Sequence, residues 1–156
     1  MQVHSSELHD FCEDNYTLIG LHTALEDYKL AYLLNKYLNK KFVREIFSLD
    51  FNNKDMVSSF SVYGFIEETS HLEWYLVSNT YVEEVTDTIG VLALTTQKKT
   101  YLIPEKKRVD YFIKILGDIS TENLYKVIQD INQLEQIVTS YIIETDKLKS
   151  KDFLIF

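Results

Sequence analysis

Strand-like runs occupy the middle of this sequence, and one helix-like segment lies on each side of them. Between residues 42 and 116, short apolar runs alternate with polar residues, and runs 59–66 and 72–79 predict a hairpin around residues 67–71. Strands grouped together, with helices kept apart from them, are typical of the α+β class. We therefore expect an antiparallel or mixed sheet of about six or seven strands with two principal helices packed on one side.

The chain has the length and composition of one domain. Its 156 residues are enough to bury a hydrophobic core, and a composition of 46% hydrophobic and 26% charged residues is typical of a globular protein. Residues 1–15 are polar and acidic without periodicity. We therefore expect a single globular domain, 1–156, in which residues 1–15 are a loose N-terminal tail.

Cysteine content and hydropathy indicate a cellular location. Cys12 is the only cysteine, which excludes an intramolecular disulfide and favours a reducing compartment. The N-terminus lacks a basic start followed by an apolar run, and the apolar runs elsewhere are too short to cross a membrane. These features predict a soluble, cytoplasmic protein with no membrane partner.

The segment after residue 22 has the pattern of a helix with two apolar faces. Thr23 and Glu26 have the spacing of a capping box, which predicts the helix start. A second apolar stripe includes Tyr28 and Tyr32, and Lys36 belongs to a basic stripe beside it. Two interpretations stay open: a helix packed between the sheet and another element, or a Tyr/Lys surface for a protein partner. The first apolar face consists of Leu30, Leu33, Leu34, Tyr37 and Leu38.

A second helix is predicted after Ser120, which is a suitable N-cap residue. Its apolar residues form one stripe from Leu124 to Val138, as in a helix that is buried on one side. Two apolar segments follow, residues 141–145 and 153–156, and we expect both to be strands.

Motifs of common enzyme chemistry are absent from the sequence. The four glycines are widely spaced, which excludes the glycine-rich phosphate-binding loops of nucleotide enzymes. No nucleophile has a recognisable base partner, and His4, His9 and Cys12 lack the fourth ligand of a zinc site. We expect no cofactor, metal or catalytic residue, so the sequence favours a non-catalytic role over an enzyme with an unrecognised site.

Positive charge is concentrated in one short segment of an acidic chain. The net charge is −8, yet residues 98–111 contain five cations and two acids, a net charge of +3, which leaves −11 on the other residues. Two interpretations stay open: an ordinary solvated turn, or a patch that binds one acidic partner while the rest of the surface repels anions. The cations are Lys98, Lys99, Lys106, Lys107 and Arg108.

We expect this segment to form a basic hairpin, residues 98–108. Pro104 cannot donate a ladder hydrogen bond, so it is predicted to end the first strand. Residues 105–108 are then the turn and residues 109–116 the return strand, and residues 82–90 are predicted to be an acidic connector before the hairpin.

Ile103, Pro104 and Glu105 are followed, after three residues, by Val109, Asp110 and Tyr111. This pattern resembles the signature of the bacterial IPExxxVDY family. Residues 17–38 and the closing sequence DFLIF are similar to the two ends of that family, so the resemblance spans nearly the whole chain. The family is named for its motif and has no established activity. Its genes lie near those for acyl carrier protein and ribonuclease III, which implies an acidic carrier protein or an RNA-processing assembly as a partner.

The motif also suggests how the hairpin would be held. Glu105 and Asp110 flank the cations and are expected to pair with them, and Tyr111 is expected to anchor the return strand. Ion pairs at a surface are weak, so the cations would stay available to a partner.

Three functional hypotheses follow. The first is a non-catalytic protein-interaction (adaptor) module, with self-association into a homodimer as an option. The second is an RNA- or anion-binding accessory factor, although the net negative charge disfavours nucleic acid. The third is an enzyme with an unrecognised site. The first would use the cations of 98–108 or Tyr28, Tyr32 and Lys36; the second would use those cations with Lys36, Lys40, Lys41 and Arg44.

Overall fold

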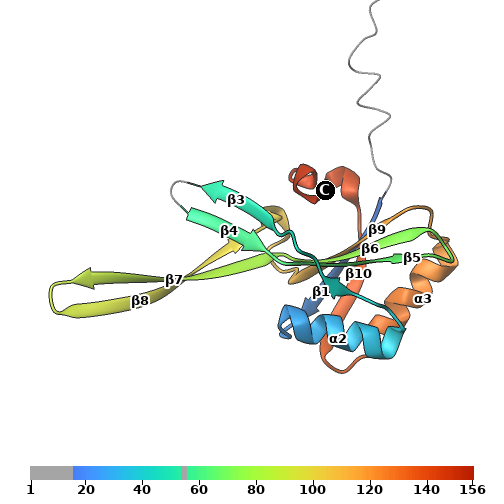
Figure 1. Cartoon of the computed structure of the whole chain (residues 1–156), viewed down its shortest axis with the longest axis horizontal. Helices are drawn as coiled ribbons and strands as arrows, with labels where there is room; N and C mark the ends of the chain where they lie inside the picture. The colour runs from blue at the N-terminus through green and yellow to red at the C-terminus, as the bar shows by residue number, and fades with distance from the viewer. Residues whose placement is uncertain (1–15, 54–55) are drawn as a thin grey trace, which may run out of the picture.

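An antiparallel sheet of six strands forms the centre of the fold, and the two helices lie on one of its faces (Figure 1). The computed structural model describes residues 16–53 and 56–156. The predicted α+β class is confirmed. In order across the sheet, the strands are β10 (Ile137–Ile143), β1 (Tyr16–Thr23), β9 (Tyr111–Leu116), β6 (Leu72–Ser78), β5 (Val62–Glu67) and β2 (Val43–Arg44). The helices are α2 (Asp27–Leu38) and α3 (Thr121–Asn132).

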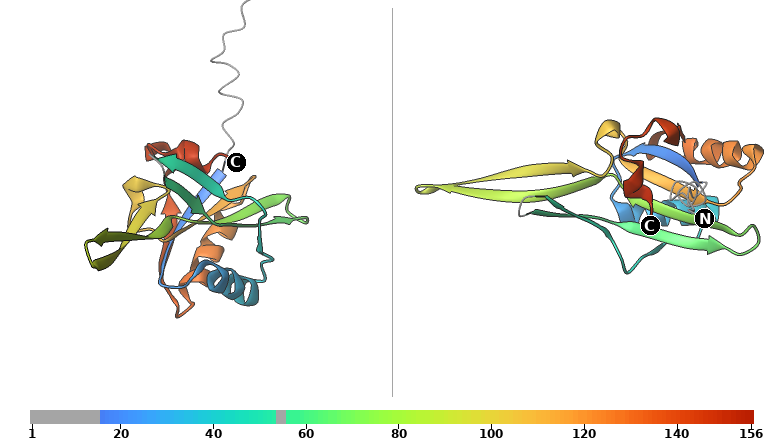
Figure 2. Two further views of the ribbon diagram at one scale, coloured as in Figure 1. Left: turned by 60° about the vertical axis from the view of Figure 1, so that its left-hand side comes forward. Right: turned by 90° about the horizontal axis from the view of Figure 1, so that it is seen from above.

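Two hairpins form separate two-stranded sheets. β3 (Leu49–Asn53) pairs with β4 (Met56–Phe60), and β7 (Thr80–Ile89) pairs with β8 (Leu92–Tyr101). The β7–β8 hairpin, called the arm below, projects away from the rest of the molecule (Figures 1 and 2). Three short 3₁₀ helices are η1 (Pro104–Lys106), η2 (Thr145–Lys147) and η3 (Lys151–Leu154).

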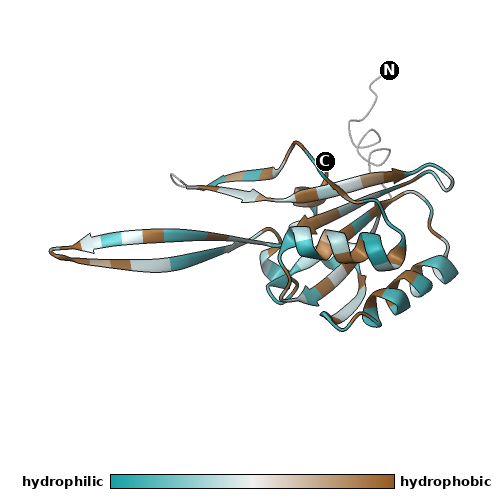
Figure 3. Cartoon of the chain, turned by 60° about the horizontal axis from the view of Figure 1, so that its bottom comes forward, coloured by the Kyte–Doolittle hydropathy of each residue, from teal (hydrophilic) through white to brown (hydrophobic). Residues whose placement is uncertain are grey.

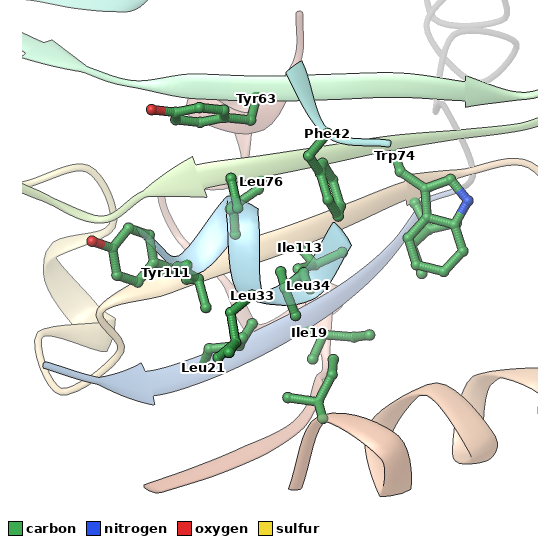
Figure 4. Close-up of a cluster of buried hydrophobic side chains, with 14 of the residues drawn as sticks. Ile19, Leu21, Leu33, Leu34, Phe42, Tyr63, Trp74, Leu76, Tyr111 and Ile113 are labelled. Carbon is green, nitrogen blue, oxygen red and sulfur yellow. The ribbon is translucent and has the colours of Figure 1, made fainter. Parts of the chain in front are cut away.

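The main core lies between the sheet and the helices. Ile19, Trp74 and Ile113 point to this side from three neighbouring strands, because alternate residues of a strand face the same way. Leu33 and Leu34 of α2 pack into the same cluster, and all five side chains are buried (Figure 4). The leucines of the first apolar face predicted for α2 therefore pack into this core, but Tyr37 of the same face is 58% exposed.

A second core covers the opposite face of the sheet, where the β3–β4 hairpin and the C-terminal segment lie. Phe112 and Leu154 are fully buried there. Lys114 of β9 is also fully buried, and its Nζ donates a hydrogen bond to the carbonyl oxygen of Leu154. The Nζ lies 4.2 Å from the centroid of the Phe156 ring. The hydrogen bond and the aromatic ring offset part of the cost of burying a charge.

The C-terminal segment corrects one prediction. The sequence predicts a strand at residues 153–156, but residues 151–154 form η3. The Leu154 carbonyl binds the Lys114 side chain instead of a neighbouring strand. A terminal segment that crosses the face of a sheet has no ladder partner, so Leu154 is buried without a strand, while Phe153 and Ile155 remain 40% and 58% exposed.

Local signals predicted one helix start correctly and one wrongly. Ser120 is the N-cap of α3, and its hydroxyl accepts a hydrogen bond from the Asn123 amide. The capping box at Thr23 is wrong, because Thr23 belongs to β1 and α2 begins at Asp27. The Thr23 hydroxyl instead donates to the Gln136 carbonyl, which ties β1 to the segment before β10. Among the described residues, no helix is long and apolar enough to cross a membrane.

Two further predictions fail because strands extend beyond their expected limits. The acidic connector at residues 82–90 is almost entirely strand β7. Acidic residues are tolerated in this strand because Glu84 and Asp87 are exposed to solvent and Glu83 is only half-buried. Val138, expected in the second helix, is 81% exposed on β10, since α3 ends at Asn132.

Asparagine side chains cap both edges of the six-stranded sheet. At one edge, Asn132 accepts from the Ser140 amide at 2.7 Å and donates to the Ser140 carbonyl at 3.2 Å. At the other, Asn35 accepts from the Phe42 amide at 2.8 Å and donates to the Phe42 carbonyl at 2.9 Å, just before β2. A carboxamide has the donor and acceptor of a peptide group, so each one occupies the place of an added strand.

We expect Asn132→Ala to lower the free energy of unfolding by about 1–3 kcal/mol, because buried backbone groups of Ser140 lose their partner. Urea denaturation measures the loss. Gln129→Ala, on an exposed position of the same helix, is the control and should change stability by less than about 0.5 kcal/mol. Equal stability of both variants would contradict the capping role.

Candidate functional site

The cationic segment is a crossover loop and not a hairpin. Strand β8 pairs with β7 inside the arm, whereas β9 pairs with β1 and β6 in the central sheet. The loop between β8 and β9 contains η1 and crosses from one sheet to the other. The predicted hairpin 98–108 is therefore wrong, because residues adjacent in sequence found their strand partners elsewhere in the chain.

Asn79 holds this loop in place from inside the protein. Its side chain is fully buried and donates to the carbonyls of Lys106 at 2.9 Å and Val109 at 2.7 Å. Its Oδ1 accepts from the Ile103 amide at 2.8 Å. The Asn79 backbone adds hydrogen bonds to Leu102 and Asp110. One side chain between β6 and β7 therefore fixes both ends of the loop, and the satisfied polar groups rigidify it.

The second half of the motif attaches the loop to the start of α2. The Asp110 carboxylate accepts from the Thr23 amide at 2.9 Å, and the Tyr111 hydroxyl donates to the Leu25 carbonyl at 2.7 Å. Burial, with the charges of Asp27 and Asp110 in support, raises the pKa of Tyr111 well above its ordinary value, so the hydroxyl stays a donor.

The apolar motif residues are part of the second core. Ile103 and Val109 are buried there. Gly20 of β1 makes room for Val109, since a Cβ on this glycine would lie 3.3 Å from the Val109 Cγ2 and 2.8 Å from the Ile143 Cδ1. A glycine in the middle of this strand thus permits close approach of the loop.

Glu105 binds the C-terminal segment and not the cations. Its carboxylate accepts from the Ser150 amide at 2.7 Å and from the Ser150 hydroxyl at 2.9 Å. Burial pushes the pKa of Glu105 up, but these hydrogen bonds outweigh it and hold the pKa below its ordinary value. The expected pairing of Glu105 and Asp110 with the cations is wrong, because both carboxylates are used to hold backbone amides.

The cations of the loop therefore lack their nearest acids. Lys107 and Arg108 are exposed and Lys106 is half-buried, and none of the three forms an ion pair within the described residues. Lys106 is close enough to Glu144 to contribute to the lowered pKa of that carboxyl. The loop presents its charge on a backbone that is fixed from behind.

The structure brings Lys107 next to one lysine of the arm. Lys107 Nζ lies 5.9 Å and Lys99 Nζ 5.5 Å from the centroid of the Tyr101 ring, so both cations lie around one aromatic side chain at the base of the arm. Lys98 faces the other side of the arm, opposite Glu83 in the register. Of the five predicted cations, Lys99 and Lys107 therefore meet at the arm's base, and Lys106 and Arg108 flank Lys107 on the same loop; these four residues are called the basal patch below.

The other predicted partner residues lie on a different element. Tyr28 and Tyr32 on α2 are 56% and 66% exposed, and nothing in the described chain covers this stripe. Within residues 16–53 and 56–156, no element packs on this stripe as the first interpretation of α2 expected. Lys36 lies 5.2 Å from the centroid of the Tyr37 ring. Within the described residues, no ion pair or ring contact links this stripe to the basal patch.

Two cations of the alternative RNA-binding set are already engaged by the fold. Lys40 pairs with Glu67 at 3.6 Å and lies 4.0 Å from the centroid of the Trp74 ring. Arg44 pairs with Asp27 at 3.2 Å. Both are thus less available to phosphate than the basal patch.

Catalytic geometry is not visible in the described residues. Two surface depressions follow α3 and the segment after it, with linings that include Tyr125, Gln129, Gln133 and Glu135, and neither lining contains a serine, threonine, cysteine, lysine or histidine. Residues 16–53 and 56–156 contain no group of three His, Cys, Asp or Glu side chains that could hold a metal ion. His4, His9 and Cys12 lie outside the described residues.

Two residues essential to this site gave no signal in the sequence. Asn79 follows a strand and has the identity of an ordinary turn residue, and Ser150 lies 45 residues from Glu105. Their roles depend on contacts between segments that are distant in the chain. No protein-family model, curated protein or solved structure matches this chain.

We expect Asn79→Ala to lower the free energy of unfolding by about 3–5 kcal/mol, since three buried backbone groups lose their partners together. Urea denaturation with far-UV circular dichroism measures it. Asn123→Ala, whose side chain is exposed on α3, serves as the control and should leave the midpoint nearly unchanged. A loss below about 1 kcal/mol at Asn79 would show that the loop is held by other contacts.

Proposed function

We propose that this protein is a non-catalytic interaction module, an adaptor, that binds an acidic protein through the basal patch. The observation that supports it is the use of Glu105 and Asp110. Both acids of the motif bind backbone amides, so they do not neutralise the cations between them. A fold that only needed a soluble loop there would gain nothing from three consecutive cations whose neighbouring acids are engaged elsewhere.

The charge distribution supports an acidic protein as the partner. The basal patch lies in the segment of net charge +3 on a chain that otherwise carries −11. Such a body repels an acidic partner everywhere except at the patch, which orients the encounter and raises its rate. A rigid loop also loses little conformational entropy on binding. A carrier protein or an RNA-processing assembly would fit this charge.

We also propose that the chain belongs to the bacterial IPExxxVDY family. In support, each of the six motif residues has a structural role, since two are buried, Pro104 begins η1, and three hold backbone groups of other segments. These roles require Asn79 and Ser150 as partners. Chains with the motif should therefore retain an asparagine after the strand equivalent to β6, which an alignment of such sequences checks. Frequent loss of this asparagine would argue against a shared structure.

One observation favours RNA as an alternative ligand of the same patch. Tyr101 lies between Lys99 and Lys107, and an aromatic ring beside cations is the usual arrangement for stacking a base next to its phosphate. Protein and RNA are distinguished by nuclease treatment and by the salt dependence of binding.

The test is affinity purification from the native cell with the chain as bait, at low salt and after nuclease treatment. We expect protein partners that are retained by the wild type and reduced about tenfold by replacing Lys106, Lys107 and Arg108 with alanine. Three surface charge pairs at about 0.5 kcal/mol each give a loss of this size. Higher salt should release the same partners.

The control replaces Lys29, Lys126 and Lys147, which are exposed on α2, α3 and η2, with alanine and removes the same net charge. It should retain the partners. Unchanged partners in the loop variant would overturn the proposal. Material that disappears with nuclease, together with direct binding of the chain to RNA, would support the alternative.

A further inference from the structure

The arm has one strand edge that is unprotected. At the two edges of the central sheet, Asn35 and Asn132 occupy backbone groups that an added strand would need. The outer edge of β7 carries Glu83, Glu84 and Asp87, and charged side chains discourage strand addition. In β8, the six residues from Leu92 to Gln97 include no charge and no proline.

The register of the arm identifies the open backbone groups of β8. Ile89 and Leu92 close a two-residue turn at Gly90 and Val91, so they form a hydrogen-bonded pair. Because such pairs alternate along an antiparallel ladder, the amides and carbonyls of Ala93, Thr95 and Gln97 point away from β7. Within the described chain, no strand pairs with this side of β8.

Large apolar side chains accompany this edge. Leu92 and Leu94 of β8 are exposed, as are Ile89 and Val91 at the tip of the arm. Figure 3 shows hydrophobic residues at the tip, where the arm is farthest from the body. An isolated two-stranded hairpin is only marginally stable in water, and strands added at its edge stabilise it.

We propose that the outer edge of β8 pairs with the same edge of a second copy of this chain. The two β8 strands run antiparallel, centred on Thr95, and the two arms become one four-stranded sheet. This goes beyond the proposed function, because it uses a different side of the arm from the basal patch.

Charge selects a second copy in this orientation. Antiparallel pairing places Lys98 of one arm beside Leu92 of the other, so the lysines of the two copies lie at opposite ends of the ladder. The acidic β7 strands are then the two outer strands, with two β8 strands between them. Parallel pairing would instead bring the lysines together, and antiparallel pairing through β7 centred on Thr86 would place Asp87 of one arm diagonally across from Glu83 of the other.

The mass of the chain in solution tests the proposal. Analytical ultracentrifugation over a concentration series should give a dimer for the wild type and a monomer for Thr95→Pro. Proline removes an outward amide at that position and leaves the ladder to β7 in place. Thr86→Pro, directly opposite Thr95 on the outer edge of β7, is the matched control and should remain a dimer.

Cross-linking tests the register, in a background with Cys12→Ser. Two Thr95 residues facing each other across the two-fold axis have Cα atoms about 5.5 Å apart, which suits a disulfide. Thr95→Cys should therefore form a covalent dimer under mild oxidation, and Thr86→Cys should not, because three strand spacings of about 4.8 Å separate the two copies of residue 86.

Each result decides for or against the proposal. A wild-type chain that stays monomeric at every concentration overturns it, including the case in which β8 binds an extended segment of another protein. A dimer that persists in Thr95→Pro and cross-links through Thr86→Cys overturns it as well. The variant in which Lys106, Lys107 and Arg108 are replaced with alanine should remain a dimer, because it leaves β8 unchanged. Loss of the acidic partner in this variant therefore tests the adaptor proposal without affecting the dimer proposal.

Discussion

The hydrogen bonds of the buried Asn79 carboxamide are the interaction on which the candidate surface depends. They join the end of β6, the beginning of η1 and the residue before Asp110. Because Asn79 is also the last residue before the arm, the same side chain fixes where the arm leaves the body and where the cationic loop returns to it. A buried carboxamide without hydrogen-bond partners costs free energy. The loop is therefore held in the one arrangement that satisfies the carboxamide.

From this point the motif attaches two other parts of the protein. Asp110 and Tyr111 hold the junction of β1 and α2, and Glu105 holds the C-terminal segment. That segment covers Lys114 on the second face of the sheet. The acids of the motif are thus structural, and the cations between them carry the charge available to a partner. The arm and the loop together carry the cations of the basal patch and the exposed apolar residues of β8, none of which belongs to the core.

The sequence predicted the class of the fold and the identity of the cations, but not their setting. The hairpin around residues 67–71 and the buried leucines of α2 arise from local periodicity, and both were predicted correctly. The basic hairpin was wrong because Lys99 and Lys107 come together through Tyr101 at the junction of two sheets. Strand partners are chosen by the whole sheet, and no local pattern specifies them.

By itself, the sequence determined that the chain forms strands flanked by two helices, that its positive charge lies in one segment, and that glycine-rich phosphate loops are absent. These are properties of periodicity and composition, which act over a few residues. Tertiary structure alone decided that Glu105 and Asp110 turn away from the cations, that Asn79 holds the loop, and that residues 80–101 stand apart as an arm. The two carboxylates and Asn79 each bind a partner more than twenty residues away, because the fold, and not the local sequence, brings a donor or acceptor next to each of these polar groups.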